Sequence, residues 1–218
     1  MTRMLLIALA FIGASFTSRV CAQNTIPFEF TSEEDNRLIK ENDSFKYYVA
    51  SGDTNNIVCL DEDGSYYKLL SKDHKLIAEG AFTVDADKYI QQGKWTEHYS
   101  NGKVKLTGYY IQGKPAGTWQ EYYNTGKLKT VFNFAIIDDD VYRSSCLSGS
   151  YQEFYQNGKI KMVGFYAATS STTKDTIGVD DPVTGERMRT VATHKTYKAE
   201  KTGNWEHYDE NGELEKKE

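Results

Sequence analysis

The sequence is short of positive charge, of proline and of apolar residues. Its formal net charge of −5 excludes a nucleic-acid binder that relies on overall basicity. Hydrophobic residues make up 39% of the chain, too few for a protein with several membrane spans. The 16 Tyr, 10 Phe and 3 Trp are too many for a disordered chain, and 3 prolines beside 17 glycines favour strands and tight turns over a helical bundle. A length of 218 residues allows one domain, or one domain with an appendage.

Motifs for metal binding and catalysis are missing as well. The four histidines, His74, His98, His194 and His207, show no metal-ligand spacing, and there is no Cys-x-x-Cys pair. The chain also lacks a nucleophile elbow, a P-loop and a dinucleotide-binding glycine fingerprint. We therefore expect no catalytic residue, no metal site and no cofactor.

The amino terminus has the order of a secretory signal peptide. A cationic start at Arg3 is followed by the almost wholly apolar residues 4–16 and by small residues at Val20 and Ala22. This predicts cleavage after Ala22 and a secreted or periplasmic protein, whose net charge changes from −5 to −7 because two arginines leave and no acid does. An uncleaved anchor and a lipid on Cys21 are the alternatives, although residues 18–20 are a poor lipoprotein box.

Two cysteines, Cys59 and Cys146, remain after this cleavage. An oxidising compartment permits a disulfide between them, but a pair is a weak signal and the spacing says nothing about their distance. A disulfide and two buried thiols both fit the sequence.

A repeat decides the architecture. Four copies align over 13 positions on an aromatic residue, a tyrosine or aspartate and a glycine: residues 93–105, 117–129, 149–161 and 203–215. A degenerate copy at residues 67–80 has His74 at the glycine position. Apolar and polar residues alternate on both sides of the glycine, which indicates two strands joined by a turn. Stacked copies predict an all-β fold, an elongated antiparallel array of β-hairpins.

The length of the turn loop is predicted from the residue before the glycine, which varies between the copies. Thr125 stands where other copies have Asn, and a β-branched residue is disfavoured at positive φ, so a three-residue loop with only the glycine left-handed fits best. We expect positive φ at the structural turn glycines Gly102, Gly126, Gly158 and Gly212.

This loop places Tyr99 opposite Lys103 and, counting outward, sets the two faces of the sheet. Glu97 and Lys105, Glu121 and Lys129, and Glu153 and Lys161 are then direct cross-strand pairs, while Trp95 is opposite Thr107. One face carries the recurring rings, which could form an exposed face for stacking on sugars or peptides: Trp95, Trp119, Tyr151 and Trp205. Such rings are more often the repeat's own packing, which is the interpretation the sequence favours. The other face, with Val104 and Leu106, is expected to be the more apolar.

The pattern Gly-x-Trp-x-x-Tyr-x-x-x-Gly-Lys, followed by Gly108 and by Gly113-Lys114, resembles the MORN-repeat variant family, named for membrane occupation and recognition nexus. The resemblance covers residues 93–166 and 203–218, and residues 67–80 less closely. It implies a β-hairpin array with a non-catalytic interaction role, and some members of the family carry an antitoxin label.

The chain thus divides into three parts: a signal peptide at 1–22, an N-terminal segment at 23–66 with a short helix and strands, and the hairpin array at 67–218. The strands expected in the second part are 45–49 and 57–60, with 66–70 following an acidic turn. The array holds a large insert at about 167–202, expected to be a flexible Ser/Thr-rich excursion followed by a hairpin, and insertions in repeat arrays often lie on a binding face.

The sequence therefore favours a non-enzymatic protein that binds an unidentified protein partner in the cell envelope. It predicts neither a nucleic-acid partner nor an integral membrane protein. A carbohydrate-binding envelope module that uses the ring face on a glycan is the alternative. An enzyme with its site in residues 24–66 or in the insert is a third hypothesis. The Glu97-His98 and Glu206-His207 pairs are poor catalytic candidates, because other copies fill the histidine position with Tyr122 or Phe154.

Overall fold

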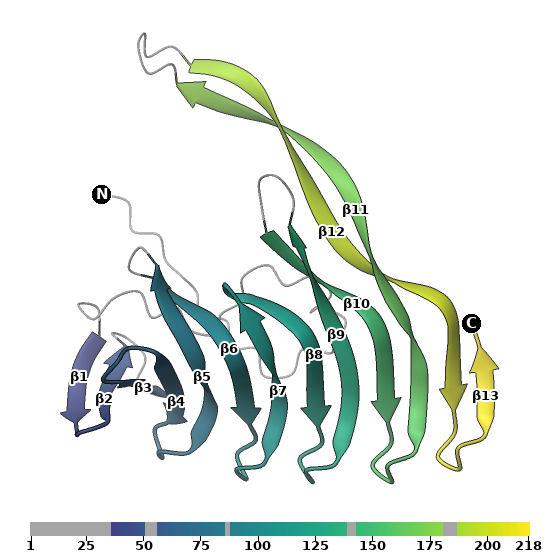
Figure 1. Cartoon of the computed structure of the whole chain (residues 1–218), viewed down its shortest axis with the longest axis horizontal. Coiled ribbons are helices and arrows are strands. Elements are labelled where there is room, and N and C mark those ends of the chain that lie inside the picture. Colours follow the sequence, from purple (N-terminus) through teal and green to yellow (C-terminus); the bar gives the residue numbers. More distant parts are fainter. Residues whose placement is uncertain (1–35, 51–55, 86–87, 139–142, 181–186) are drawn as a thin grey trace.

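The computed structural model describes residues 36–50, 56–85, 88–138, 143–180 and 187–218, which form strands and turns without any helix. Thirteen strands make one open antiparallel sheet in which each strand is hydrogen-bonded to the next in chain order. Their bounds are β1 Asn36–Glu41, β2 Phe45–Ala50, β3 Asn56–Asp61, β4 Tyr66–Ser71, β5 Leu76–Asp85, β6 Lys88–His98, β7 Val104–Ile111, β8 Lys114–Tyr122, β9 Leu128–Asp138, β10 Arg143–Phe154, β11 Ile160–Asp180, β12 Arg187–Tyr208 and β13 Leu214–Lys217. Curved hairpins stand side by side from β1 to β13, as the sequence predicts (Figure 1).

The four repeat turns have the predicted geometry. In the first, the Gly102 amide donates to the Tyr99 carbonyl and the Tyr99 amide donates to the Lys103 carbonyl, each at 2.8 Å. The four turn glycines have φ values of 81°, 89°, 89° and 85° for Gly102, Gly126, Gly158 and Gly212. His74 has a φ of 58° and makes the same turn, so residues 67–80 fold as a fifth copy.

Replacing Gly126 by alanine should lower the free energy of unfolding by on the order of 1 kcal/mol, because a Cβ is disfavoured at positive φ. The new Cβ would approach only the flexible Lys103 side chain, at 3.4 Å, so backbone strain is the whole expected cost. Urea unfolding checks this, with the exposed neighbour Thr125→Ala as control. Equal unfolding midpoints for the two variants would contradict the turn assignment.

The register beyond the turn differs from the prediction by one residue. His98 is opposite Val104 as predicted, but a β-bulge follows, so that Glu97 is opposite Leu106 and Trp95 is opposite Gly108. The same shift occurs in the other three copies. A turn signal fixes only the first pairs of a hairpin, and a bulge further along the strand moves every later pair.

The predicted Glu–Lys ion pairs nevertheless form, since the bulge leaves the lysine beside the glutamate although it is not directly opposite. The Nζ to Oε distances are 3.3 Å for Lys105–Glu97, 3.0 Å for Lys129–Glu121 and 2.7 Å for Lys161–Glu153. The bulge also turns Leu106 onto the face of Trp95, where it is buried. The prediction that the opposite face is the more apolar is therefore wrong, because the core lies on the tryptophan face.

The N-terminal strands β2, β3 and β4 coincide with the predicted runs and continue the same sheet. The predicted signal peptide and the start of the predicted short helix, residues 31–35, lie outside the described residues, and the strand β1 follows directly where such a helix would continue. Cys59 on β3 and Cys146 on β10 are both buried and are not joined in a disulfide, which settles the two alternatives in favour of thiols. Burial raises the pKa of the Cys59 thiol to about 11.

The insert forms a hairpin as predicted, but its Ser/Thr-rich residues 169–173 belong to the strand β11 and not to a flexible excursion. The strands β11 and β12 run on beyond the array as one continuous two-stranded hairpin, paired from Phe165–Thr202 out to Asp180–Arg187. Threonine is favoured in strands, so the composition fits an extended ribbon as well as a loop. Figure 1 shows this hairpin leaving the array and curving away from it.

Candidate functional site

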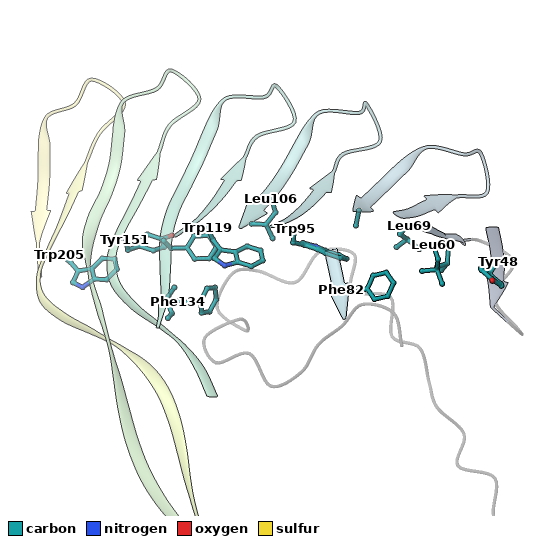
Figure 2. Close-up of a cluster of buried hydrophobic side chains, with 14 residues drawn as sticks. Tyr48, Leu60, Leu69, Phe82, Trp95, Leu106, Trp119, Phe134, Tyr151 and Trp205 are labelled. Carbon is teal, nitrogen blue, oxygen red and sulfur yellow. The ribbon is translucent and has the colours of Figure 1, made fainter. Parts of the chain in front are cut away.

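The recurring rings lie in one row that runs across the strands of the sheet (Figure 2). Following the strand pairing, we define the ring row as eight residues: Gly80, Trp95, Gly108, Trp119, Phe132, Tyr151, Gly164 and Trp205. A large ring therefore alternates with a glycine along most of the row.

Each tryptophan in the row lies over the glycine of the preceding hairpin. A Cβ placed on Gly80 would stand 2.5 Å from the ring of Trp95, and one on Gly108 would stand 2.1 Å from Trp119. Gly164 has the same relation to Trp205, at 2.2 Å. None of these three glycines has a positive φ, so the approach of the ring is what requires glycine there.

The second and third hairpins keep this packing with different residues. Phe132 stands at the glycine position and Tyr151 stands opposite it at the tryptophan position. Phe132 is larger than the glycine of the other pairs, and its partner Tyr151 is smaller than their tryptophan. This exchange of volume within one pair is the behaviour of two side chains that fill a common space.

All four rings named as binding candidates are buried, which fits packing within the repeat and contradicts an exposed binding face. The exposed fractions are 3% for Trp95, 3% for Trp119, 5% for Tyr151 and 1% for Trp205. Neighbouring rings cover them, for example Tyr110, which meets the two indoles of Trp95 and Trp119 edge to face with centroids 6.0 Å and 5.2 Å apart. The sheet is curved and its rings pack against one another, which alternation along a strand does not reveal.

A second set of repeat residues joins each turn to the next. The hydroxyl of Tyr99 donates to the Tyr122 carbonyl at 2.7 Å, and those of the next two repeat tyrosines donate onward in the same way. The lysine after each of the first three turn glycines adds a second contact, as when Lys103 Nζ donates to the Thr125 carbonyl at 2.6 Å. We call this set the turn ladder, and its members are Tyr99, Lys103, Tyr123, Lys127, Tyr155 and Lys159.

Removing one tyrosine hydrogen bond of the turn ladder should lower the stability of the protein by a modest, measurable amount. Tyr123→Phe loses the hydrogen bond to the Phe154 carbonyl, 2.7 Å long, and should lower the free energy of unfolding by about 0.5–1.5 kcal/mol. Tyr109→Phe is the matched control, because that ring is 55% exposed on the other face. If both variants unfold at the same urea concentration, the tyrosine hydroxyls do not hold the hairpins together.

The fourth turn carries different residues at the ladder positions. Asp209 replaces the tyrosine, and its carboxylate accepts from the backbone amides of Asn211 and Glu213 at 2.9 Å and 2.8 Å. These hydrogen bonds lower the pKa of Asp209, with the bond from Glu213 as the largest cause. The Asp209 side chain therefore bonds within its own turn. The fourth hairpin accepts the hydrogen bond from Tyr155 but does not continue the turn ladder.

Histidines and acidic residues, which are common in catalytic and metal sites, make contacts within the array. His98 lies 3.6 Å from Glu79, and His207 lies 3.6 Å from Glu218. The carboxylate of Asp61 accepts from the backbone of Ser65 and Tyr66, each at 2.8 Å, which explains one acidic turn. Within the described ranges, no group of three His, Cys, Asp or Glu side chains could hold a metal ion.

Ring row and turn ladder together define a single-sheet β-hairpin repeat protein. The model of the MORN repeat variant matches residues 91–112, 116–135, 147–168 and 201–218. The chain is therefore a MORN-type repeat protein with four copies of the variant repeat between residues 91 and 218. Searches of curated proteins and of solved structures found no match. The described part of the chain has no helix with the length and apolarity to span a membrane.

Proposed function

We propose that this protein is a secreted or periplasmic, non-enzymatic repeat protein that mediates protein–protein interaction at the cell envelope. The observation that carries the proposal is that the repeat residues pack against one another. The rings contact each other, and the turn-ladder residues join neighbouring turns. Together they build a long sheet whose outer face, the face opposite the ring row, carries exposed side chains. Large single-sheet surfaces of this kind are used in repeat proteins to bind partners. The order of charged, apolar and small residues at the amino terminus supports export.

The glycan alternative is less well supported. It depended on stacking of sugars on the recurring rings, and those rings are at most 5% exposed. The outer face instead offers isolated rings such as Tyr109 and Phe165, each 55% exposed. Single exposed rings between polar side chains are more typical of a protein interface than of a sugar platform.

Site-specific photo-crosslinking in the source organism tests the proposal. A photoreactive residue at Tyr109 or Phe165 should give a covalent adduct with an envelope protein, whereas the same residue at the exposed turn position Asn124 serves as the control for random collisions. Amino-terminal sequencing of the recovered protein should begin at Gln23. Retention of Met1 together with a lack of adducts at both sites would contradict the proposal.

A further inference from the structure

The part of the β11–β12 hairpin beyond the array has two edges to which no other described strand is paired. We define the ribbon as residues 167–180 and 187–202. The strand β10 pairs with β11 only as far as Tyr166, and β12 meets the C-terminal strand only from Trp205 onward. Among the described residues, ribbon strands therefore pair only with each other, and each presents one edge of backbone amides and carbonyls. Such an edge is a template for another strand.

One face of the ribbon is basic. Successive side chains in a strand alternate between faces, so the face that leaves the core at Tyr166 continues through every second residue. Besides Lys201, which pairs with Glu218 at 3.3 Å, the exposed cations on that face are Lys174, Arg187, Arg189 and Lys195. The guanidinium of Arg187 lies across Gly178, where a Cβ would come within 2.5 Å of its Nε.

The charge on this face is not balanced across the hairpin. Lys174 is opposite Thr193 and Lys195 is opposite Thr172, while Arg189 is opposite Gly178. Only Arg187 has an acidic residue, Asp180, opposite it in the register.

The lysines of the array provide the comparison. Lys105, Lys129 and Lys161 each lie within 3.3 Å of a glutamate on the same hairpin. Like charges that are close together on one face of a hairpin destabilise it. A chain with a net charge of −5 thus gathers three cations that have no acidic residue directly opposite, Lys174, Arg189 and Lys195, on its projecting element, which is favourable when an acidic partner covers them.

We infer that the ribbon binds an extended, acidic segment of a partner protein, which adds as a third strand along the edge of β12. This inference rests on the proposed function and names the partner's chemistry. Three of the four cations, Arg187, Arg189 and Lys195, are on β12, so carboxylates on a strand beside β12 would lie next to them. The edge supplies backbone hydrogen bonds and the cations supply selectivity for acidic sequences.

Binding of a labelled peptide to the full mature chain tests the inference. The probe is a 12-residue peptide in which Glu alternates with Val and Thr, and its control is the same peptide with alternate backbone nitrogens methylated. Methylation keeps the charge but removes the donors needed for strand addition. We expect the unmethylated peptide to bind at least ten-fold more tightly, with an affinity that falls as salt increases.

Paired protein variants locate the site. Lys174→Ser, Arg189→Ser and Lys195→Ser together should weaken peptide binding at least ten-fold. The control combines Lys72→Ser, Lys75→Ser and Lys94→Ser, which removes the same charge from exposed positions outside the ribbon and should leave binding unchanged. The array should stay folded in both, because Tyr155 and Lys159 join the third and fourth turns beneath the ribbon.

Three outcomes would overturn the inference. Equal binding of the methylated peptide would indicate attraction to any polyanion, and tighter binding of phosphatidylglycerol vesicles or dextran sulfate would indicate a lipid or a polysaccharide instead. Aggregation of the ribbon variant without any peptide binding by the parent would show that the cations only protect the edges. In each case adducts from Tyr109 and Phe165 would still report on the proposed function independently.

Discussion

Replacing Trp119 by alanine should lower the free energy of unfolding by about 3–5 kcal/mol, the usual cost of removing a large buried ring. The indole is 3% exposed and lies between the backbone of Gly108 and the edges of Tyr110 and Phe134. Because each hairpin is stable only against its neighbours, the loss should lower the urea midpoint of the whole array.

Phe165→Ala is the control for this substitution, since that ring is 55% exposed on the other face and its removal should change stability by less than about 0.5 kcal/mol. Circular dichroism in urea gives both values. A Trp119→Ala variant as stable as Phe165→Ala would show that the ring row is not the core.

Replacing Gly108 by alanine should also be strongly destabilising, by about 1–3 kcal/mol or more, because a close-packed core resists even one added methyl group. The new Cβ would stand 2.1 Å from Trp119, so the indole must move away from the sheet. Gly178→Ala provides the matched control, because there the new Cβ meets only the flexible side chain of Arg187.

A second substitution separates ring packing from other effects of alanine. In the Gly108→Ala background, Trp119→Tyr should recover part of the lost stability, since the second and third hairpins combine a large residue, Phe132, with Tyr151 at the same two positions. A double variant less stable than Gly108→Ala alone would mean that the glycine is required for a reason other than the indole.

The turns could be predicted from the sequence because their chemistry is local. Thr125 beside Gly126 excludes a two-residue loop, and the observed positive φ of the glycine follows from that alone. The N-terminal strands were equally accessible, since 45–49 and 57–60 are short runs of strand-forming residues. His74 also took its predicted place at a glycine position.

The faces of the sheet could not be predicted in the same way. A bulge at Lys105 leaves the sequence alternation unchanged yet carries Leu106 to the opposite face, and only the positions of both strands reveal it. Burial of Trp95 likewise depends on Gly80 from the preceding strand and Tyr110 from the next. The recurrence of a glycine before each tryptophan can be seen in the sequence. Only the strand register shows that the two residues pack against each other.

Acrylamide quenching of tryptophan fluorescence tests the central claim most directly, because the chain has only three tryptophans and all three are in the ring row. With exposed fractions of 3%, 3% and 1%, the native protein should emit at short wavelength and be quenched far less than the same protein unfolded in urea. Quenching of the native protein at the rate of the unfolded chain would mean that the rings face solvent, which would contradict their assignment as the packing core of the array.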